Sequence, residues 1–187
     1  KWSYGINMDV LGCVVEVITK MTFAEYLQKN IFDPLDLKSI GFSVNPQDKD
    51  SFTTLYTSGA FSRDGEVVAP SGLNQAELMY SAELRPIDKF DNSPYLTNSS
   101  KLFDGGSGLV SNIDDYSKFA EMLLNGGVLN GVRILSEASV EVMSRNHLSK
   151  EILSDGSAFG LNGIGFGLTV GNVMDPGVAG TYSAEGE

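Results

Sequence analysis

The chain has 187 residues, of which 13 are basic and 24 acidic, and its formal net charge at pH 7 is −11. A surface this acidic repels phosphate backbones and disfavours nucleic-acid binding. One cysteine and one histidine argue against a disulfide framework and against a Cys- or His-rich metal site. Hydrophobic residues make up 42% and charged residues 20%, as in a globular domain with a substantial core, and no stretch predicts a membrane span.

The two ends of the chain favour a fragment of a longer protein. The chain begins at Lys1, with no charged leader, apolar core or cleavage site, so no signal peptide is predicted. Residues 184–187 resemble a loop that stops before a further strand. We therefore expect the targeting region to be missing, which leaves the localisation unknown: periplasmic, secreted and cytoplasmic locations are all compatible with the sequence.

The apolar residues of 8–20 recur at helical spacing and predict a helix with a wide apolar face. Gly12 interrupts this pattern at a cost of about 1 kcal/mol relative to alanine, which favours a close packing contact. Cys13 is expected to be a small buried hydrophobe, because no base or cation is arranged near it in sequence. Glu16 is expected on a solvated face.

A capping box predicts the start of the next helix. Thr22 and Glu25 have the spacing at which each side chain bonds the backbone N–H of the other. Met21 and Tyr26 occupy the two positions of a hydrophobic staple. Pro34 cannot continue the helix, so we expect the helix to end near Phe32.

The middle of the chain predicts short strands followed by irregular structure. Residues 52–58 and 66–69 are rich in β-branched and aromatic types, with turn-forming residues 62–65 between them, so a hairpin or two short antiparallel strands are expected. Prolines and asparagines interrupt residues 71–103, which we expect to be mostly irregular with one short helix.

Residues 105–127 form the clearest unit of the sequence. Ser111 is the predicted N-cap of a helix whose first turn carries Asp114-Asp115, where carboxylates suit the positive end of the helix dipole. Gly126-Gly127 are expected to terminate this helix. Its apolar face is expected to contain Tyr116, Phe119, Ala120, Met122, Leu123 and Leu124.

A short helix and one strand are predicted near the C-terminal end. Ser136 is the expected cap of a helix over 137–145, with Val140 and Met143 facing inward. Residues 164–171 are expected to form one strand that glycines interrupt.

The sequence contains no complete motif for a nucleophile, a phosphate or a metal. Ser-x-x-Lys, Gly-x-Ser-x-Gly, a P-loop, His-Glu-x-x-His and an EF-hand loop are all absent from it. Residues 105–108 resemble a phosphate loop but lack its lysine, and the negative net charge opposes that use. His147 follows a predicted helix and is expected at a helix end or on the surface. No pair of carboxylates has a sequence reason to face a common cleft, so the residues alone indicate only an acidic α+β domain.

Several segments, in order along the chain, resemble the serine β-lactamase-like superfamily. Residues 2–12 read Trp-Ser-Tyr-x-x-x-x-Asp-Val-Leu-Gly, and residues 34–42 read Pro-Leu-x-Leu-x-x-Ile-Gly-Phe. Residues 106–127 are similar to a later glycine-rich loop and helix of that family, and 165–168 to its Gly-x-Gly-Leu strand. The most similar branch holds the class C β-lactamases and the β-lactamase-like carboxylesterases.

The resemblance implies an α+β fold, with a helical subdomain and a few antiparallel strands of a serine β-lactamase/transpeptidase-like fold. Residues 1–187 would form an incomplete domain of this kind. The helical subdomain would occupy most of 1–160, and one sheet strand would lie near 164–171.

The resemblance also implies a role for Tyr4. In the family, a serine and a lysine from Ser-x-x-Lys act with a tyrosine, and Tyr4 matches the position of that tyrosine. A serine hydroxyl is a weak nucleophile that needs a positioned base, and a neighbouring lysine would stabilise the phenolate that serves as this base. The alternative for Tyr4 is an aromatic side chain that packs beside Trp2. With the family match, the catalytic role is favoured.

Two departures from the family pattern shape the expected function. Tyr4-Gly5-Ile6 carries isoleucine where the β-lactamase Tyr-x-Asn motif has asparagine, which favours the esterase-like branch. Ser-x-x-Lys and the third active-site motif are not in the sequence, and with them the nucleophile and the oxyanion hole are missing. We therefore expect a fragment of a serine hydrolase that acts on an ester through an acyl-serine intermediate and is inactive alone.

Two alternatives stay open: a fragment of a β-lactamase or D-Ala-D-Ala carboxypeptidase, and a non-catalytic, degenerate family member that binds a partner. The resemblance implies no metal and no organic cofactor. For the parent protein it implies a small-molecule ester, β-lactam or peptide-like substrate. An incomplete sheet would expose an edge that favours self-association, and it would leave Phe166, Leu168 and Val170 open.

Overall fold

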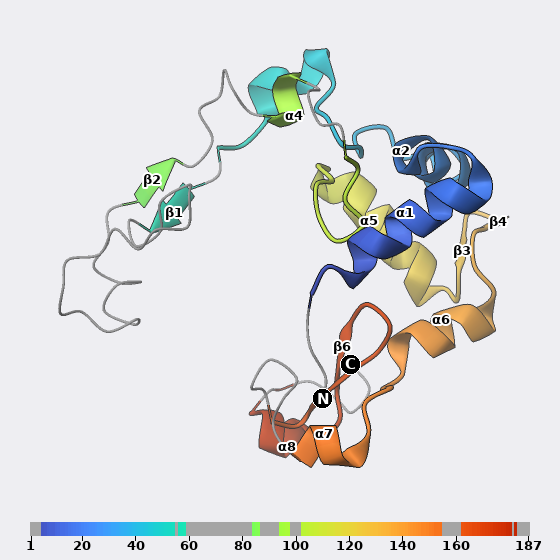
Figure 1. The fold of residues 1–187 in the computed structure, drawn as a ribbon, viewed down its shortest axis with the longest axis vertical. Coiled ribbons are helices and arrows are strands. Elements are labelled where there is room, and N and C mark those ends of the chain that lie inside the picture. Colours follow the sequence, from blue (N-terminus) through green and yellow to red (C-terminus); the bar gives the residue numbers. More distant parts are fainter. Residues whose placement is uncertain are drawn as a thin grey trace. The chain divides into compact units, whose positions relative to one another are not determined.

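A computed structural model describes residues 5–54, 56–58, 84–86, 94–97, 102–154, 162–180 and 182 (Figure 1). The chain divides into two compact units, one made of residues 1–40 and 103–187 and the other of residues 41–102. Helices and three two-stranded antiparallel sheets make up the described elements, which confirms the predicted α+β class. The expectation of one partial domain, mostly helical over 1–160, stays a prediction.

Helix α1 spans Asn7–Thr19, as its apolar spacing predicts. Its apolar face is exposed, with fractions from 43% to 75%, over Val10, Leu11, Val14, Val17 and Ile18. Cys13 is exposed too, so the expected burial of this cysteine is wrong. The reason is that nothing in the part of the chain that the structure describes covers this face of α1.

Helix α2 spans Phe23–Leu27 and begins with the predicted capping box. Thr22 Oγ1 accepts the N–H of Glu25 at 3.2 Å, and Glu25 Oε2 accepts the N–H of Thr22 at 2.9 Å. The helix continues as a π-helical turn, η1 (Gln28–Phe32), so it ends where Pro34 predicts. The wider π turn itself is not encoded in the apolar spacing.

Glu16 ties α1 to the start of α2. Its Oε1 accepts the N–H of Phe23 at 2.7 Å, which satisfies one of the free donors of a helix N-terminus. Glu16 is half-buried, so its expected place on a solvated face is wrong. The reason is tertiary, because the chain reverses between the two helices and packs α2 against α1 (Figure 1).

Helix α5 spans Ile113–Leu124 and begins one residue later than predicted. The N-cap is Asn112, whose Oδ1 accepts the N–H of Asp115 at 2.8 Å. Ser111 instead donates its hydroxyl to the carbonyl oxygen of Asn112 at 3.2 Å. Asparagine and serine are equally good caps, so local preference could not choose between neighbours. Gly126-Gly127 terminate the helix as predicted, with φ values of 65° and 91°.

A tight hairpin follows α5. Strands β3 (Val128–Leu129) and β4 (Val132–Arg133) pair antiparallel around Asn130-Gly131. The two turn residues have φ values of 49° and 81°, as a type I′ turn requires. An Asn-Gly pair is a strong hairpin signal, so this hairpin was predictable from the sequence.

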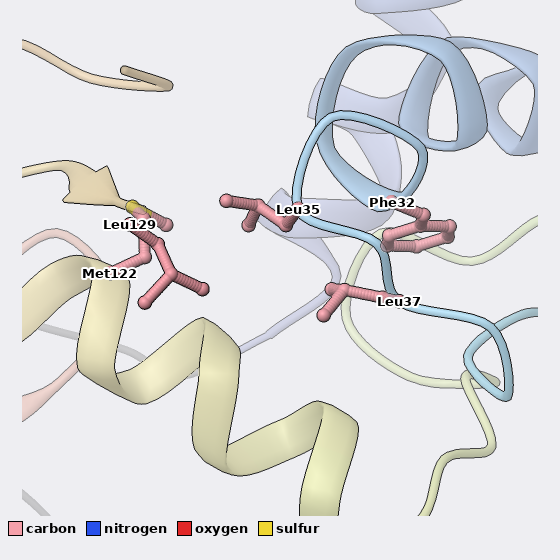
Figure 2. Close-up of a cluster of buried hydrophobic side chains, with 5 residues drawn as sticks. All are labelled: Phe32, Leu35, Leu37, Met122 and Leu129. Carbon is pink, nitrogen blue, oxygen red and sulfur yellow. The ribbon is translucent and has the colours of Figure 1, made fainter. Parts of the chain in front are cut away.

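The core of the first unit joins the segment after α2 to α5 and β3 (Figure 2). Its five buried side chains are Phe32, Leu35, Leu37, Met122 and Leu129. Met122 is fully buried, and Phe119 and Leu123 pack against the cluster, so these three residues confirm the predicted face of α5. The rest of that prediction is wrong, because the side chains of Tyr116, Ala120 and Leu124 are exposed.

Three short helices lie among the described residues of the C-terminal part. Helix α6 spans Glu137–Ser144, and Ser136 caps it as predicted by accepting the N–H of Ser139. The inward side chains predicted for α6, Val140 and Met143, are half-buried. Helices α7 and α8 span Lys150–Ser154 and Pro176–Ala179.

The single strand predicted over 164–171 is instead a hairpin. Strand β5 (Ile164–Phe166) pairs antiparallel with β6 (Gly171–Val173). A hairpin satisfies backbone donors and acceptors within the segment, whereas one strand needs a partner from elsewhere. Leu168 and Val170, in the turn, are exposed as expected, and Phe166 is half-buried.

Two asparagines hold this hairpin to the end of α6. Asn146 Oδ1 accepts the N–H of Phe166 at 3.0 Å, and Asn172 Nδ2 donates to the carbonyl oxygen of Ser144 at 2.7 Å. A Cβ at Gly165 would lie only 2.6 Å and 2.7 Å from the two asparagine Oδ1 atoms. A larger residue at this strand position would therefore displace the two asparagine side chains that hold the hairpin.

The second unit contains a small sheet and a short helix. Strand β1 (Tyr56–Ser58) pairs antiparallel with β2 (Leu84–Pro86). The predicted partner strand at 66–69 lies outside the described residues. Strand β2 lies in the segment 71–103, which was expected to be mostly irregular. A strand of three residues is too short to show the alternation of apolar and polar residues by which a strand is predicted from sequence. Helix α4 (Pro94–Thr97) confirms the short helix.

The aromatic contact of the second unit involves α4. The rings of Phe52 and Tyr95 have their centroids 6.0 Å apart, and the N–H of Val44 donates to the carbonyl oxygen of Tyr95 at 2.9 Å. A 3₁₀ turn, η2 (Pro46–Ser51), lies between Val44 and Phe52 in the sequence.

Candidate functional site

Tyr4, the residue that the sequence predicts to be catalytic, lies outside the described residues. The description begins at Gly5, the next residue, and α1 begins at Asn7. The structure therefore describes the residues that follow Tyr4 in the sequence, namely the first turn of α1, and the segment that packs on that turn. Ile6 is the N-cap of α1, and its side chain makes no capping hydrogen bond.

A glycine-rich loop packs directly on the first turn of α1. The N–H of Gly106 donates to Asp9 Oδ1 at 2.9 Å, across 97 residues of sequence. A Cβ at Gly105 would overlap the carbonyl oxygen of Met8, and a Cβ at Gly106 would lie 3.2 Å from Asp9 Oδ1. We refer to this contact of Met8 and Asp9 with Gly105-Gly106 as the α1–glycine joint.

Gly12 continues the close approach one turn further along α1. It is buried, and a Cβ there would lie 3.6 Å from the Cα of Gly105 and 3.6 Å from Cδ1 of Phe23. The expectation that Gly12 permits close packing is therefore confirmed. Glycines on both sides let the backbone of the loop approach the backbone of the helix.

The α1–glycine joint gives the glycine-rich loop a structural role. A phosphate-binding loop offers its backbone N–H groups to an anion, but here the N–H of Gly106 is bonded to the carboxylate of Asp9. That negative side chain would repel a phosphate. The structure therefore agrees with the sequence in disfavouring a phosphate at residues 105–108.

Asp115 was predicted only to suit the positive end of the helix dipole, but in the structure it also joins α5 to a distant segment. It is buried, its Oδ2 accepts the N–H of Ser39 at 2.6 Å, and its Oδ1 lies 3.2 Å from Lys118 Nζ. Burial raises the pKa of this carboxyl, but the N–H of Ser39 and the ammonium of Lys118 outweigh it, so the net pKa is below the usual range. Lys118 also donates to the carbonyl oxygen of Asp36 at 2.9 Å. Asp115 therefore fixes the segment that follows the core leucines.

The other titratable residues singled out in the sequence lie elsewhere. Asp114 is exposed in the first turn of α5, as predicted. Glu25 is exposed in the capping box, and the N–H and hydroxyl of Thr22 lower its pKa. His147 is exposed beyond the end of α6, with Nε2 2.7 Å from the carbonyl oxygen of Val142. These contacts confirm the capping and helix-end interpretations of Glu25 and His147.

Within the described ranges, no three His, Cys, Asp or Glu side chains are grouped closely enough to hold a metal ion. The same residues include no helix whose length and apolar character would allow it to cross a bilayer.

Asp9 holds the glycine-rich loop against α1, a role that the sequence analysis did not assign to it. It stands in the Trp-Ser-Tyr-x-x-x-x-Asp segment, so the resemblance contained the residue but not its partner. The partner, Gly106, is 97 residues away. A contact at this separation leaves no local pattern, and only the fold reveals it.

Comparison with known sequences places the chain beside β-lactamase-like proteins. The sequence model of the β-lactamase family matches residues 1–186. Protein Rv1367c of Mycobacterium tuberculosis is 28% identical over 177 residues, which cover 93% of this chain and 38% of that protein. ML-236A carboxylate methylbutanoyltransferase mlcH of Penicillium citrinum is 23% identical over 152 residues, which cover 81% of this chain and 30% of that protein.

Solved structures share the fold. EstCE1, described as a hydrolase with promiscuous acyltransferase activity, has a TM-score of 0.67 and 22% identity, covering 100% of this chain and 44% of its own. The simvastatin synthase LovD from Aspergillus terreus has a TM-score of 0.68 and 22% identity, covering 100% of this chain and 43% of its own. These likenesses show that the chain has part of a serine β-lactamase and penicillin-binding-protein-like fold. The chain spans less than half the length of each of these proteins.

Proposed function

We propose, because the chain belongs to the β-lactamase family, that it is part of a serine hydrolase that cleaves an ester through an acyl-serine intermediate. In this reaction the serine oxygen bonds to the acyl carbon, the ester C–O bond breaks, and the leaving alcohol takes up the proton of the serine. Water then attacks the acyl-serine, releases the acid and restores the hydroxyl. The observation that carries the proposal is the family match over residues 1–186.

Tyr4 is the residue of this chain that we assign to the reaction. Its phenol would relay the serine proton to the leaving alcohol, as the family match of residues 2–12 implies. Ile6 replaces the asparagine of the β-lactamase motif, and this supports an ester over a β-lactam as the substrate.

We also propose that the 187-residue chain is inactive alone. It covers 38% to 44% of Rv1367c, LovD and EstCE1, and it has no Ser-x-x-Lys. The exposed apolar face of α1 supports this view. An apolar helix face is normally buried against another element, so this face is expected to be covered by the remainder of the fold.

A second candidate differs only in the acyl acceptor. The relative mlcH is a methylbutanoyltransferase by name, and a further relative, mokF of Monascus pilosus, is named an acyltransferase. An alcohol in place of water would attack the same acyl-serine and form a new ester. This acyltransferase would use the same catalytic residues as the hydrolase. Only the reaction products, an ester in one case and an acid in the other, distinguish the two candidates.

The test is the hydrolysis of a short-chain p-nitrophenyl ester by three proteins: the 187-residue chain, the whole reading frame that encodes it, and the whole reading frame with Tyr4→Phe. We expect turnover by the whole protein only, with a loss of at least about a hundredfold in Tyr4→Phe, the scale of lost acid–base catalysis. Repeating the assay with an added alcohol shows whether an ester product forms. A chromogenic β-lactam tests the lactamase alternative.

The outcomes separate the proposals. Turnover by the 187-residue chain would show that a nucleophile lies within it and would refute the inactivity. Full activity of Tyr4→Phe would remove Tyr4 from the mechanism. If the whole protein cleaves neither substrate, the non-catalytic binding module becomes the better account.

A further inference from the structure

We propose that Asp9 is a positioning residue for the reaction, because its carboxylate fixes the turn of α1 that follows Tyr4 against residues 105–106. The inference rests on the proposed function for its effect on catalysis. Its structural part, that Asp9 holds this turn in place, stands on the α1–glycine joint alone.

The carboxylate of Asp9 bonds to a distant loop, although its position in the helix usually favours a bond to the N-cap residue. Ile6 is the N-cap, so Asp9 is the third residue of the helix. An acidic residue there commonly bonds back to the N–H of the N-cap residue, as Glu25 does in α2. Asp9 Oδ1 instead accepts the N–H of Gly106, from a loop 97 residues away. The side chain therefore connects two distant segments.

The backbone on both sides of the contact is closely packed. Gly105 has no room for a Cβ beside the carbonyl oxygen of Met8, and Gly12 meets Gly105 one turn further along α1. The loop therefore has little room to slide along α1. The hydrogen bond from Gly106 then sets the distance between the loop and Asp9. Without that bond, the hydrogen bonds that the described residues show for the first turn of α1 are its own backbone bonds, such as Val10 N–H to the carbonyl oxygen of Ile6.

Tyr4 lies five residues before Asp9 and two before the N-cap. A small displacement of the first turn would therefore displace the phenol from the serine and the leaving group. A misplacement of about 1 Å in a reacting group can cost about a hundredfold in rate. Substrate binding need not change, so the effect is expected in kcat and not in KM.

The experiment uses the whole protein in four forms: wild type, Asp9→Ala, Asp9→Asn and Asp114→Ala. Asp9→Ala removes the acceptor, whereas Asp9→Asn keeps an oxygen that can accept the N–H of Gly106. Asp114→Ala is the matched control, because Asp114 also lies in the first turn of a helix but is exposed, and no side-chain hydrogen bond joins it to another described residue. Each form is assayed for ester hydrolysis and for amide hydrogen exchange, after a thermal melt confirms folding.

We expect kcat to fall at least about tenfold in Asp9→Ala, with KM within twofold, and to recover mostly in Asp9→Asn. Exchange is expected to rise in peptides covering 5–9 and 103–108 of Asp9→Ala, while the peptide covering 12–19 stays as in wild type. Asp114→Ala should leave all of these values unchanged. Wild-type kcat in a folded Asp9→Ala protein would overturn the positioning role.

The two proposals fail separately. If wild type shows no turnover, the proposed function fails, and the exchange data still decide whether Asp9 holds the turn. Unchanged exchange at both 5–9 and 103–108 in Asp9→Ala would overturn the inference whether or not the protein is an enzyme. A uniform rise that includes 12–19 would also overturn it, since it would show general destabilisation and no specific positioning.

Discussion

The buried carboxylate of Asp115 accepts a hydrogen bond from the backbone N–H of Ser39, with 2.6 Å between Oδ2 and N, across 76 residues of sequence. Ser39 follows Leu35 and Leu37, whose side chains lie in the core with Met122 of the same helix as Asp115 (Figure 2). One polar contact and one apolar cluster therefore join the same two segments.

The stability of the protein is expected to depend on pH through Asp115. The pKa of this carboxyl is lowered in the folded state, so its contribution is complete above the unfolded pKa of about 3.9 and is lost as the pH falls through the folded value. Asp115→Asn should cost about 1–3 kcal/mol at pH 7, in line with hydrogen bonds to charged groups. The difference from wild type should shrink below about pH 4. Urea unfolding between pH 2.5 and 7 measures it, with the exposed neighbour Asp114→Asn as the control; a gap that is constant with pH would contradict the assignment.

Met122 and Leu124 give a matched pair on one helix. Met122 is 0% exposed in the core, and Leu124 is 86% exposed two residues later. Met122→Ala is expected to lower the free energy of unfolding by about 2–5 kcal/mol, because it leaves a cavity among buried leucines. Leu124→Ala should change it by less than about 0.5 kcal/mol. Denaturant titrations of both variants check this pair, and equal losses would mean that the exposed end of α5 is covered in solution.

Gly105 tests the α1–glycine joint sterically. A Cβ at Gly105 would overlap the carbonyl oxygen of Met8, whereas a Cβ at Gly5 has no atom within 4 Å. Gly105→Ala is therefore expected to cost about 1–3 kcal/mol, since helix and loop must separate. Gly5→Ala should be close to neutral in stability. Thermal melts of the two variants provide the measurement, and a neutral Gly105→Ala would show that the two backbones do not approach this closely.

The capping box of α2 makes a more local prediction. Thr22 Oγ1 accepts the N–H of Glu25, so Thr22→Ala should cost about 0.5–2 kcal/mol. Ser117→Ala, in the exposed middle of α5, serves as the control and is expected to be neutral. Urea unfolding at neutral pH compares the two, and an equal response would show that the cap adds nothing to the protein.

Local chemistry made several elements predictable. Ser136 and Thr22 act as caps because their side chains reach N–H groups three residues away. Gly126-Gly127 end α5 because they adopt positive φ values at low cost. Where two good caps stood side by side, as at 111–112, local rules placed the helix start one residue early.

Other errors fall where a contact outside the helix or strand itself decides the outcome. Glu16 bonds to the start of another helix, and residues 164–171 pair within a hairpin. Cys13 was expected to be a small buried hydrophobe because no base or cation is arranged near it in sequence, but burial depends on what covers the helix face that carries it.

The sequence by itself determined the caps at Thr22 and Ser136, the glycine end of α5, the α+β class and the resemblance that led to the β-lactamase family, because these depend on residue types at short, fixed spacings. Only the tertiary structure decided that Asp115 bonds to Ser39 and that Asp9 bonds to Gly106. Those contacts span 76 and 97 residues, and chain folding alone brings such atoms within hydrogen-bond distance.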